Sequence, residues 1–184
     1  IQDLKESNKQ ILITGCMPET DKSQIMQLNP KVNFLVLDKN QKLVVPKIPQ
    51  NKLISITQIS EGCLGNCTYC KTKLAKRKLF SYNMDEIVKS IKSDLKAGAK
   101  EVWITSQDVA NYNLEKGPQK LPELLNKILS LNHRFKLRLG MMDPNNVLPI
   151  VNELIEIYKN KKIYKFFHMP IQSASNKVLK NMNR

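Results

Sequence analysis

The residues of this sequence best suited to chemistry are three cysteines in one short stretch. They stand in Glu61-Gly-Cys-Leu-Gly-Asn-Cys-Thr-Tyr-Cys70, with the spacing C-x3-C-x2-C, at Cys63, Cys67 and Cys70. The two glycines of this segment permit a tight loop that turns three thiolates toward one centre. Four cysteines in the chain are few for a disulfide framework, and their clustering favours metal ligation.

Two kinds of metal centre fit this spacing. A structural zinc takes four ligands, and no histidine lies near the segment, so Cys16 would have to complete a four-thiolate site. Iron–sulfur clusters are also held by closely spaced thiolates, normally four. Three thiolates on a four-iron cubane leave one iron without a protein ligand, and a substrate or cofactor can bind there. We favour the cluster because Cys16 belongs to a preceding part of the chain.

The elements around the cysteines predict where they lie in the fold. From residue 53 onward, the apolar pattern predicts strands that alternate with helices. The strands are expected over 53–59, 101–105, 135–139 and 163–168, and the helices over 84–97, 121–131 and 146–159. This alternation predicts an α/β fold with parallel strands and right-handed crossovers, either a (β/α) barrel or an open doubly wound sheet. A closed eight-stranded barrel needs about 250 residues, so any barrel here is partial.

The helix over 84–97 has the clearest local signals. Asn83 is an N-cap residue with Glu86 three positions later, and Gly98 follows the last apolar position. In parallel α/β folds, the reactive groups collect on the loops that follow the strands. We therefore expect the segments after the four strands to share one face: 61–73, 106–112, 140–145 and 168–175.

Residues 1–45 are predicted to belong to a different domain. A polar helix end over 1–9 precedes a pattern of strand, helix and strand over 11–14, 21–28 and 33–37, which indicates the C-terminal βαβ piece of a parallel-sheet domain. A polar stretch with Pro46 and Pro49 predicts a linker over 46–52. The sequence begins at Ile1 without methionine and stops inside a helical pattern, so we expect a fragment, with an incomplete second domain over 53–184.

The charge of the chain indicates a polyanionic partner. Thirty basic and sixteen acidic residues give a net charge of +14. The basic residues are densest at Lys71, Lys73, Lys76, Arg77 and Lys78. Such a cluster can contact the phosphates of a nucleic acid, although a lysine-rich surface also serves solubility alone. Because no stretch approaches the roughly 18 apolar residues of a membrane span, we expect a cytoplasmic protein without a membrane partner.

The cysteine loop resembles the one that defines the radical S-adenosylmethionine superfamily, including an aromatic residue, Tyr69, directly before the last cysteine. Further stretches resemble the methylthiotransferases within it: Ile59 to Lys73, Trp103-Ile-Thr-Ser-Gln-Asp108, Arg138-Leu-Gly-Met-Met142 and His168-Met-Pro-Ile-Gln-Ser-Ala-Ser175. The run Cys-Lys-Thr-Lys is similar to the archaeal and eukaryotic branch, which acts on threonylcarbamoyladenosine beside the tRNA anticodon. Nearly the whole chain takes part in this resemblance.

The resemblance implies a partial radical S-adenosylmethionine barrel and a set of cofactors. A 4Fe–4S cluster on Cys63, Cys67 and Cys70 would bind the amino and carboxylate groups of S-adenosylmethionine at its open iron. A second, auxiliary 4Fe–4S cluster would use three cysteines of the N-terminal domain, of which Cys16 resembles the third. We expect no catalytic residue beyond these ligands, with tRNA and an electron donor as partners of a monomer. Three alternatives stay open: methylthiolation of isopentenyl-adenosine in tRNA, methylthiolation of a ribosomal protein, and a non-catalytic RNA-binding module stabilised by zinc.

Several polar residues near the expected strand ends are candidates for cofactor binding: Tyr69, Ser106, Gln107, Asp108, Arg138 and Gln172. The carboxylate of Asp108 suits the ammonium group or a ribose hydroxyl of the cofactor. Ser106 serves equally well as a loop hydrogen-bonding residue. Arg138 suits a carboxylate of the cofactor or of the modified base, or an ion pair with Asp108 or Asp143.

Overall fold

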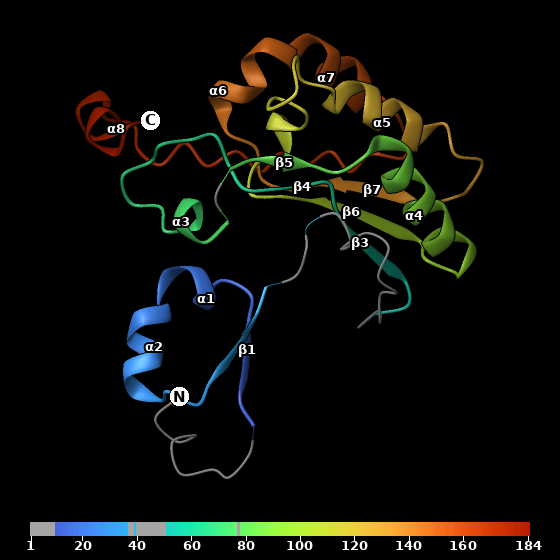
Figure 1. Cartoon of the computed structure of the whole chain (residues 1–184). Helices are drawn as coiled ribbons and strands as arrows, with labels where there is room; N and C mark the ends of the chain where they lie inside the picture. The colour runs from blue at the N-terminus through green and yellow to red at the C-terminus, as the bar shows by residue number, and fades with distance from the viewer. Residues whose placement is uncertain (1–9, 37–38, 40–50, 77) are drawn as a thin grey trace.

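The computed structural model describes residues 10–36, 39, 51–76 and 78–184 (Figure 1). The helix end expected over 1–9, most of the linker expected over 46–52, and Arg77 lie outside these residues. Across the described ranges, no helix has the length and apolar character that crossing a bilayer requires.

The N-terminal unit, residues 10–36, has the predicted strand–helix–strand order. β1 (Leu12–Thr14) and β2 (Asn33–Leu35) pair in parallel, and α1 (Met17–Thr20) and α2 (Lys22–Leu28) connect them. The short helix α1 was not predicted, because four residues are too few for a periodic pattern. Ile25, at 2% exposure, is the buried side chain of α2.

The central sheet consists of three parallel strands in the order β3–β6–β7. These are β3 (Ile54–Gln58), β6 (Glu101–Thr105) and β7 (Lys136–Leu139). Three helices cover one face of this sheet: α4 (Met84–Lys96), α5 (Leu121–Leu129) and α7 (Val151–Tyr158) (Figure 1). The core therefore forms between Val102, Ile104, Leu137 and Leu139 of the strands and the apolar faces of these helices. The prediction of a parallel α/β sheet is confirmed.

The other face of the central sheet carries larger polar and aromatic groups. Successive side chains of a strand point to opposite faces, so the neighbours of the buried core residues point away from the helices. Ile56, Trp103 and Arg138 lie in register on this open face, one from each strand. Ile56 is 55% exposed there.

The predicted helix signals explain α4, whereas the helix expected over 146–159 is broken. The side chain of Asn83 accepts hydrogen bonds from the N–H groups of Asp85 and Glu86, as predicted. The second segment divides into α6 (Pro144–Val147), the 3-10 turn η4 (Leu148–Ile150) and α7. The break follows from Pro149, which has no N–H to donate to the preceding helical turn.

The fourth strand, expected over 163–168, is wrong. Only Ile163 forms an isolated parallel bridge, with Leu137. Beyond it, the hydroxyl of Tyr158 donates to the carbonyl of Phe166 at 3.2 Å, and the Tyr158 ring stacks on Phe167 with 4.0 Å between centroids. The segment still runs beside β7, because the N–H of Tyr164 donates to the carbonyl of Leu137 at 2.9 Å, but it forms no further bridge with that strand.

Between residues 60 and 111, four short elements were not predicted. β4 (Ser60–Glu61) and β5 (Phe80–Ser81) form an antiparallel pair, and α3 (Thr72–Lys76) lies between them in the sequence. The turn η3 (Val109–Asn111) follows β6, and α8 (Asn176–Met182) ends the chain. α8 agrees with the helical pattern noticed there, and Ser175 precedes it without a capping hydrogen bond from its side chain.

Candidate functional site

The cysteine loop, residues 62–79, is held closed at its base. β4 and β5 pair on either side of it, with Glu61 opposite Phe80, and the N–H of Tyr82 donates to the carbonyl of Ile59 at 3.0 Å. Because Ile59 directly follows β3, the loop leaves the central sheet at the C-terminal end of a parallel strand. This is where groups that bind ligands collect in such folds.

The three loop cysteines are partly exposed free thiols. The N–H of Gly65 donates to Sγ of Cys63 at 3.2 Å. Burial raises the pKa of the Cys63 thiol. Burial also acts to raise the pKa of Cys70, but hydrogen bonds from Thr72 and from the N–H of Lys73 outweigh it and lower that pKa below its ordinary value.

The absence of a side chain at Gly65 leaves room between two of the sulfurs. A Cβ there would lie 3.3 Å from Sγ of Cys63 and 3.8 Å from Sγ of Cys67. Three thiols on one loop, with backbone N–H donors beside them, supply three of the four thiolates that normally hold an iron–sulfur cluster. In the described part of the chain, no three His, Cys, Asp or Glu side chains meet as ligands of a single metal ion.

Gln107 joins the loop that follows β6 to the cysteine loop. Its Oε1 accepts a hydrogen bond from the N–H of Gly62 at 2.8 Å. Ser106 has a local contact, because its hydroxyl accepts from the N–H of Asp108 at 3.0 Å. Both residues thus lie at the predicted edge of the sheet, and their contact with a cofactor stays a prediction.

Asp108 is 1% exposed and has three hydrogen-bond donors around it. It accepts from the N–H groups of Ala110 at 3.0 Å and Asp143 at 3.1 Å, and from Nδ2 of Asn146 at 2.6 Å. Burial raises its pKa despite these hydrogen bonds. The carboxylate therefore ties the β6 loop to the start of α6, and these contacts favour a positioning role over the expected contact with the cofactor.

Arg138 lies between two aromatic rings on the open face of the central sheet. Its guanidinium carbon is 4.8 Å from the centroid of Trp103 and 5.2 Å from that of Phe166. Asp108 is held by the donors named above, and Asp143 pairs with Arg184, so neither is the partner of Arg138. Arg138 can therefore present its charge to an anionic group on this face.

The remaining predicted cofactor residues are on the surface. Tyr69 is 50% exposed beside Cys70. Gln172 is exposed and has a left-handed backbone conformation with φ of 66°. The structure does not bring Gln172 into a described contact with the cysteine loop.

The C-terminal end of α8 packs on the cysteine loop, and the sequence did not predict this contact. The N–H of Thr68 donates to the carbonyl of Met182 at 3.1 Å, and Nδ2 of Asn183 donates to the carbonyl of Asn66 at 3.0 Å. Arg184 reaches Sγ of Cys67, with Nη1 at 3.9 Å. No local signal could have revealed these contacts, since more than a hundred residues separate the two segments.

The basic cluster divides into residues with different surroundings. Lys71, Lys73 and Lys78 are exposed, and Lys73 donates a hydrogen bond to Asn66. Lys76 forms an ion pair of 3.7 Å with Glu61, whose side chain is 3% exposed. Lys76 therefore compensates a buried carboxylate, while the other described lysines are available to an external polyanion.

The N-terminal unit lies beside the cysteine loop. α1 contacts α3 (Figure 1). Nζ of Lys39 donates to the carbonyls of Lys76 at 3.1 Å and Lys78 at 3.4 Å. Cys16, at the start of α1, is exposed. Cys16, the predicted metal ligand outside the cysteine loop, therefore precedes a helix, α1, that contacts α3 of that loop.

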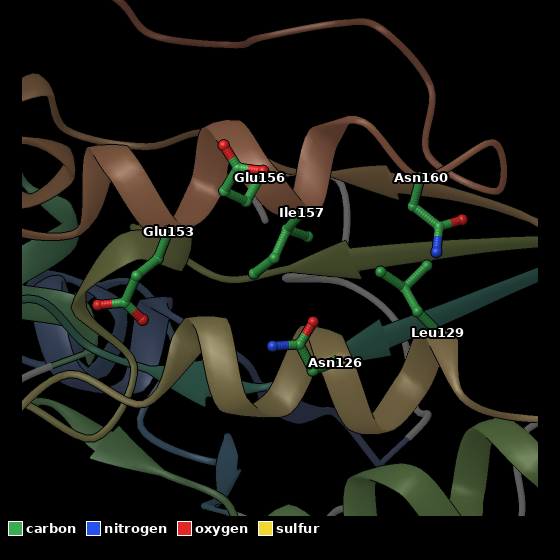
Figure 2. Close-up of a pocket in the computed structure, with 6 residues that line it drawn as sticks. All are labelled: Asn126, Leu129, Glu153, Glu156, Ile157 and Asn160. Atoms are coloured by element: carbon green, nitrogen blue, oxygen red, sulfur yellow. The ribbon is translucent and has the colours of Figure 1, made fainter.

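A pocket on the outer helix layer does not belong to this site. Figure 2 shows the six residues that line it, from α5 and from α7 with the turn that follows: Asn126, Leu129, Glu153, Glu156, Ile157 and Asn160. One of its carboxylates, Glu156, pairs with Lys159 at 2.6 Å. None of the lining residues follows the C-terminal end of a strand, so the pocket is separate from the cysteine loop.

Known proteins resemble the chain over most of its length. A probable threonylcarbamoyladenosine tRNA methylthiotransferase of Archaeoglobus fulgidus is 36% identical over 99% of this chain and 48% of its own length. The human threonylcarbamoyladenosine tRNA methylthiotransferase is 35% identical over 100% of the chain and 37% of its own length. The chain thus spans about half, or less, of the length of these relatives.

Solved structures share the fold at low sequence identity. The cobalamin-dependent S-adenosylmethionine radical enzyme OxsB superposes with a TM-score of 0.65 at 12% identity, over 94% of this chain and 32% of its own. The radical S-adenosylmethionine methyltransferase TsrM of Kitasatospora setae gives 0.55 at 16% identity, over 68% and 23%. The prediction of a partial radical S-adenosylmethionine fold is confirmed. The sequence pattern of the Radical SAM superfamily matches residues 57–184, from β3 through the three loop cysteines to α8, and the chain belongs to that superfamily.

Proposed function

We propose that the chain is part of a radical S-adenosylmethionine enzyme that adds a methylthio group to threonylcarbamoyladenosine in tRNA. The observation that carries this proposal is the similarity, over essentially the whole chain, to archaeal and human proteins with that name. The cysteine loop also supports the proposal, because its three thiols could bind a cluster at the C-terminal end of a parallel strand, where ligand-binding groups collect.

Membership of the superfamily implies a 4Fe–4S cluster and S-adenosylmethionine as cofactors. Cys63, Cys67 and Cys70 would hold the cluster. When bound, the cluster supplies the electron that cleaves a carbon–sulfur bond of S-adenosylmethionine. The N–H of Gly65 stabilises negative charge on the Cys63 sulfur, and Gln107 orients the start of the loop through Gly62.

The substrate nucleoside is proposed to bind on the open face of the central sheet. The threonylcarbamoyl group carries a carboxylate, and the guanidinium of Arg138 is a donor for it. Trp103 and Phe166 flank this guanidinium and shield it from water on two sides. A neutral substituent such as an isopentenyl group offers Arg138 no charged partner, so this residue would favour the carboxylate-bearing nucleoside.

The auxiliary cluster and the macromolecular partners are part of the same proposal. Cys16 would be one of three ligands of the second 4Fe–4S cluster, and the contact of α1 with α3 supports a place for it beside the loop. Lys71, Lys73 and Lys78 would contact tRNA phosphates, and an electron donor would reduce the cluster.

Anaerobic reconstitution of the chain tests the cofactor part of the proposal. We expect about four irons and four sulfides per chain, as a 4Fe–4S cluster requires, and formation of 5′-deoxyadenosine after chemical reduction with S-adenosylmethionine. Cys67→Ser should abolish this cleavage, while Cys16→Ser, the matched control, should retain it. A colourless protein that holds a single zinc would overturn the proposal.

The substrate is tested with the complete protein that contains this chain. It is expressed in a host strain that lacks its own tRNA methylthiotransferases, and the tRNA nucleosides are identified by mass spectrometry. Methylthiolated threonylcarbamoyladenosine is the expected product. Methylthiolated isopentenyl-adenosine, or unchanged tRNA from a strain in which the protein is loaded with cluster, would contradict the assignment.

A further inference from the structure

The segment that carries Cys67 is held on both sides by the end of α8. Asn66 accepts through its carbonyl from Nδ2 of Asn183 at 3.0 Å. Thr68 donates twice, through its N–H to the carbonyl of Met182 at 3.1 Å and through its hydroxyl to the carbonyl of Asn181 at 3.2 Å. The backbone on either side of Cys67 therefore cannot move without breaking contacts to the C-terminal helix.

Arg184 extends this contact to the sulfur itself. Its Nη1 lies 3.9 Å from Sγ of Cys67 and pairs with the carboxylate of Asp143, while Nη2 donates to the carbonyl of Pro170 at 2.8 Å. The side chains of Arg184 and Asp143 are only 10% and 16% exposed. The guanidinium is thus fixed by three partners from three different loops, with little solvent around it.

The positive charge of Arg184 beside Sγ of Cys67 affects the reduction potential of a cluster bound by that sulfur. Reduction of an iron–sulfur cluster adds one negative charge, and hydrogen bonds to the sulfurs and nearby charges set its potential. A partly buried cation beside a ligand sulfur is weakly screened, so it stabilises the reduced state. A carboxylate next to that cation offsets part of the effect.

We propose that Arg184 is a positioning residue of the cluster, which holds Cys67 in place and raises the reduction potential, and that Asp143 moderates it. This inference rests on the proposed function, since it needs a cluster on the loop cysteines. It assigns to the C-terminal end of α8 a role in setting how readily the enzyme accepts its electron.

Redox titration of the reconstituted chain, followed by electron paramagnetic resonance without S-adenosylmethionine or tRNA, tests the proposal. Arg184→Gln should lower the ratio of reduced to oxidised cluster at the wild-type midpoint about tenfold, which is about 59 mV for one electron. Asp143→Asn should shift the midpoint in the opposite direction. Asparagine is also a good N-cap residue, so this variant keeps the cap that Asp143 gives to the N–H of Asn145 at the start of α6.

Two further variants separate electrostatics from damage to the loop. Arg184→Lys keeps the charge and should stay close to the wild-type midpoint. Arg134→Gln removes the same charge from an exposed position before β7, at the opposite edge of the sheet, and should leave the midpoint unchanged.

Opposite shifts for Arg184→Gln and Asp143→Asn support the proposal, because a merely structural role would not reverse sign. Equal midpoints in all variants, or shifts of the same sign, overturn it. If Arg184→Gln holds no cluster, the other two variants decide. A raised midpoint in Asp143→Asn with a midpoint close to wild type in Arg184→Lys supports the proposal, and an unchanged or lowered midpoint in Asp143→Asn overturns it. A wild-type chain that assembles no cluster refutes the proposed function itself, whereas a cluster with unshifted potentials refutes only this inference.

Discussion

Gly62 and Gln107 connect two loops that lie far apart in the sequence: the N–H of Gly62 donates to Oε1 of Gln107 at 2.8 Å. Gly62 has a φ of 83°, a left-handed conformation that glycine adopts without steric cost. The cysteine loop therefore begins with a backbone turn that a side chain from the β6 loop holds in place. The two loops meet because β3 and β6 are parallel neighbours in the central sheet.

Gln107→Ala should weaken the hold of the loop on its metal. The N–H of Gly62 would lose its acceptor, and loss of an outer contact of this kind typically costs about tenfold in metal affinity. The measurement is the rate of iron release to a chelator from the reconstituted chain. Gln107→Glu is the matched control, because it keeps an acceptor oxygen at the same reach. Equal release from all three proteins would show that this hydrogen bond does not position the loop.

Gly65→Ala tests the space between the sulfurs. The added Cβ would lie 3.3 Å from Sγ of Cys63, which must give way by a few tenths of an ångström, and 3.8 Å from Sγ of Cys67, which is ordinary contact. We expect the iron bound per chain after reconstitution to fall, because overpacking displaces a ligand sulfur. Leu64→Ala, at a neighbouring exposed position, should bind iron like the wild type. Full iron content in Gly65→Ala would contradict the packing argument.

Asp108→Ala should destabilise the fold and not merely the site. It leaves the N–H groups of Ala110 and Asp143 and the Nδ2 of Asn146 without their acceptor, at a cost of about 3 kcal/mol in the free energy of unfolding. Asp108→Asn keeps one acceptor oxygen and should cost about 1 kcal/mol. Urea unfolding measures both values. A stable Asp108→Ala protein would leave the expected contact of Asp108 with the cofactor as the better interpretation.

The destabilisation caused by Asp108→Asn should decrease as the pH rises. Burial raises the pKa of Asp108 above its ordinary value of 3.8, so the native state binds this proton more tightly than the unfolded chain. The contribution of Asp108 to stability is then largest below 3.8 and falls as the pH rises through the raised pKa. The cost of Asp108→Asn should therefore be larger near about pH 4 than near about pH 7. An equal cost at both values would argue against a raised pKa.

Arg138→Gln should change the fluorescence of Trp103, the single tryptophan of the chain. The guanidinium lies 4.8 Å from the centroid of that residue, and its removal should cost about 1 kcal/mol of stability. In the wild type, added threonylcarbamoyladenosine nucleoside should quench the emission more strongly than isopentenyl-adenosine does. The variant should show equal responses to both nucleosides. Equal responses in the wild type would remove Arg138 from the proposed substrate site.

Lys71→Gln combined with Lys78→Gln should weaken tRNA binding without loss of stability. Both lysines are exposed, and the loss of two phosphate contacts should reduce the log–log slope of affinity against salt by about 1.5. Lys76 is left intact because it pairs with the buried Glu61. Lys89→Gln with Lys92→Gln, two exposed positions on α4, removes the same charge elsewhere. If both pairs of substitutions weaken binding equally, the loop lysines contribute only general charge.

Local patterns predicted the elements that repeat or are capped. The alternation of strands and helices from residue 53 appears as β3, α4, β6, α5 and β7, and the Asn83 cap of α4 forms as expected. Such signals work because strand and helix periods depend on near neighbours in the sequence. The strand expected over 163–168 did not form, because pairing with β7 depends on contacts between distant segments, such as that of Phe166 with Arg138, which a local pattern does not contain.

The sequence by itself determined the three thiols, their spacing and the loop glycines, because these lie within one segment. Only the tertiary structure decided that Gln107 holds the start of that loop, that Lys76 compensates Glu61, and that Arg184 stands beside Cys67. Each of these contacts joins residues from separate segments, and it exists only once the sheet and its helices have packed. The cysteine ligands can therefore be identified from their spacing in the sequence. The charges and hydrogen bonds around them can be identified only from the packed fold.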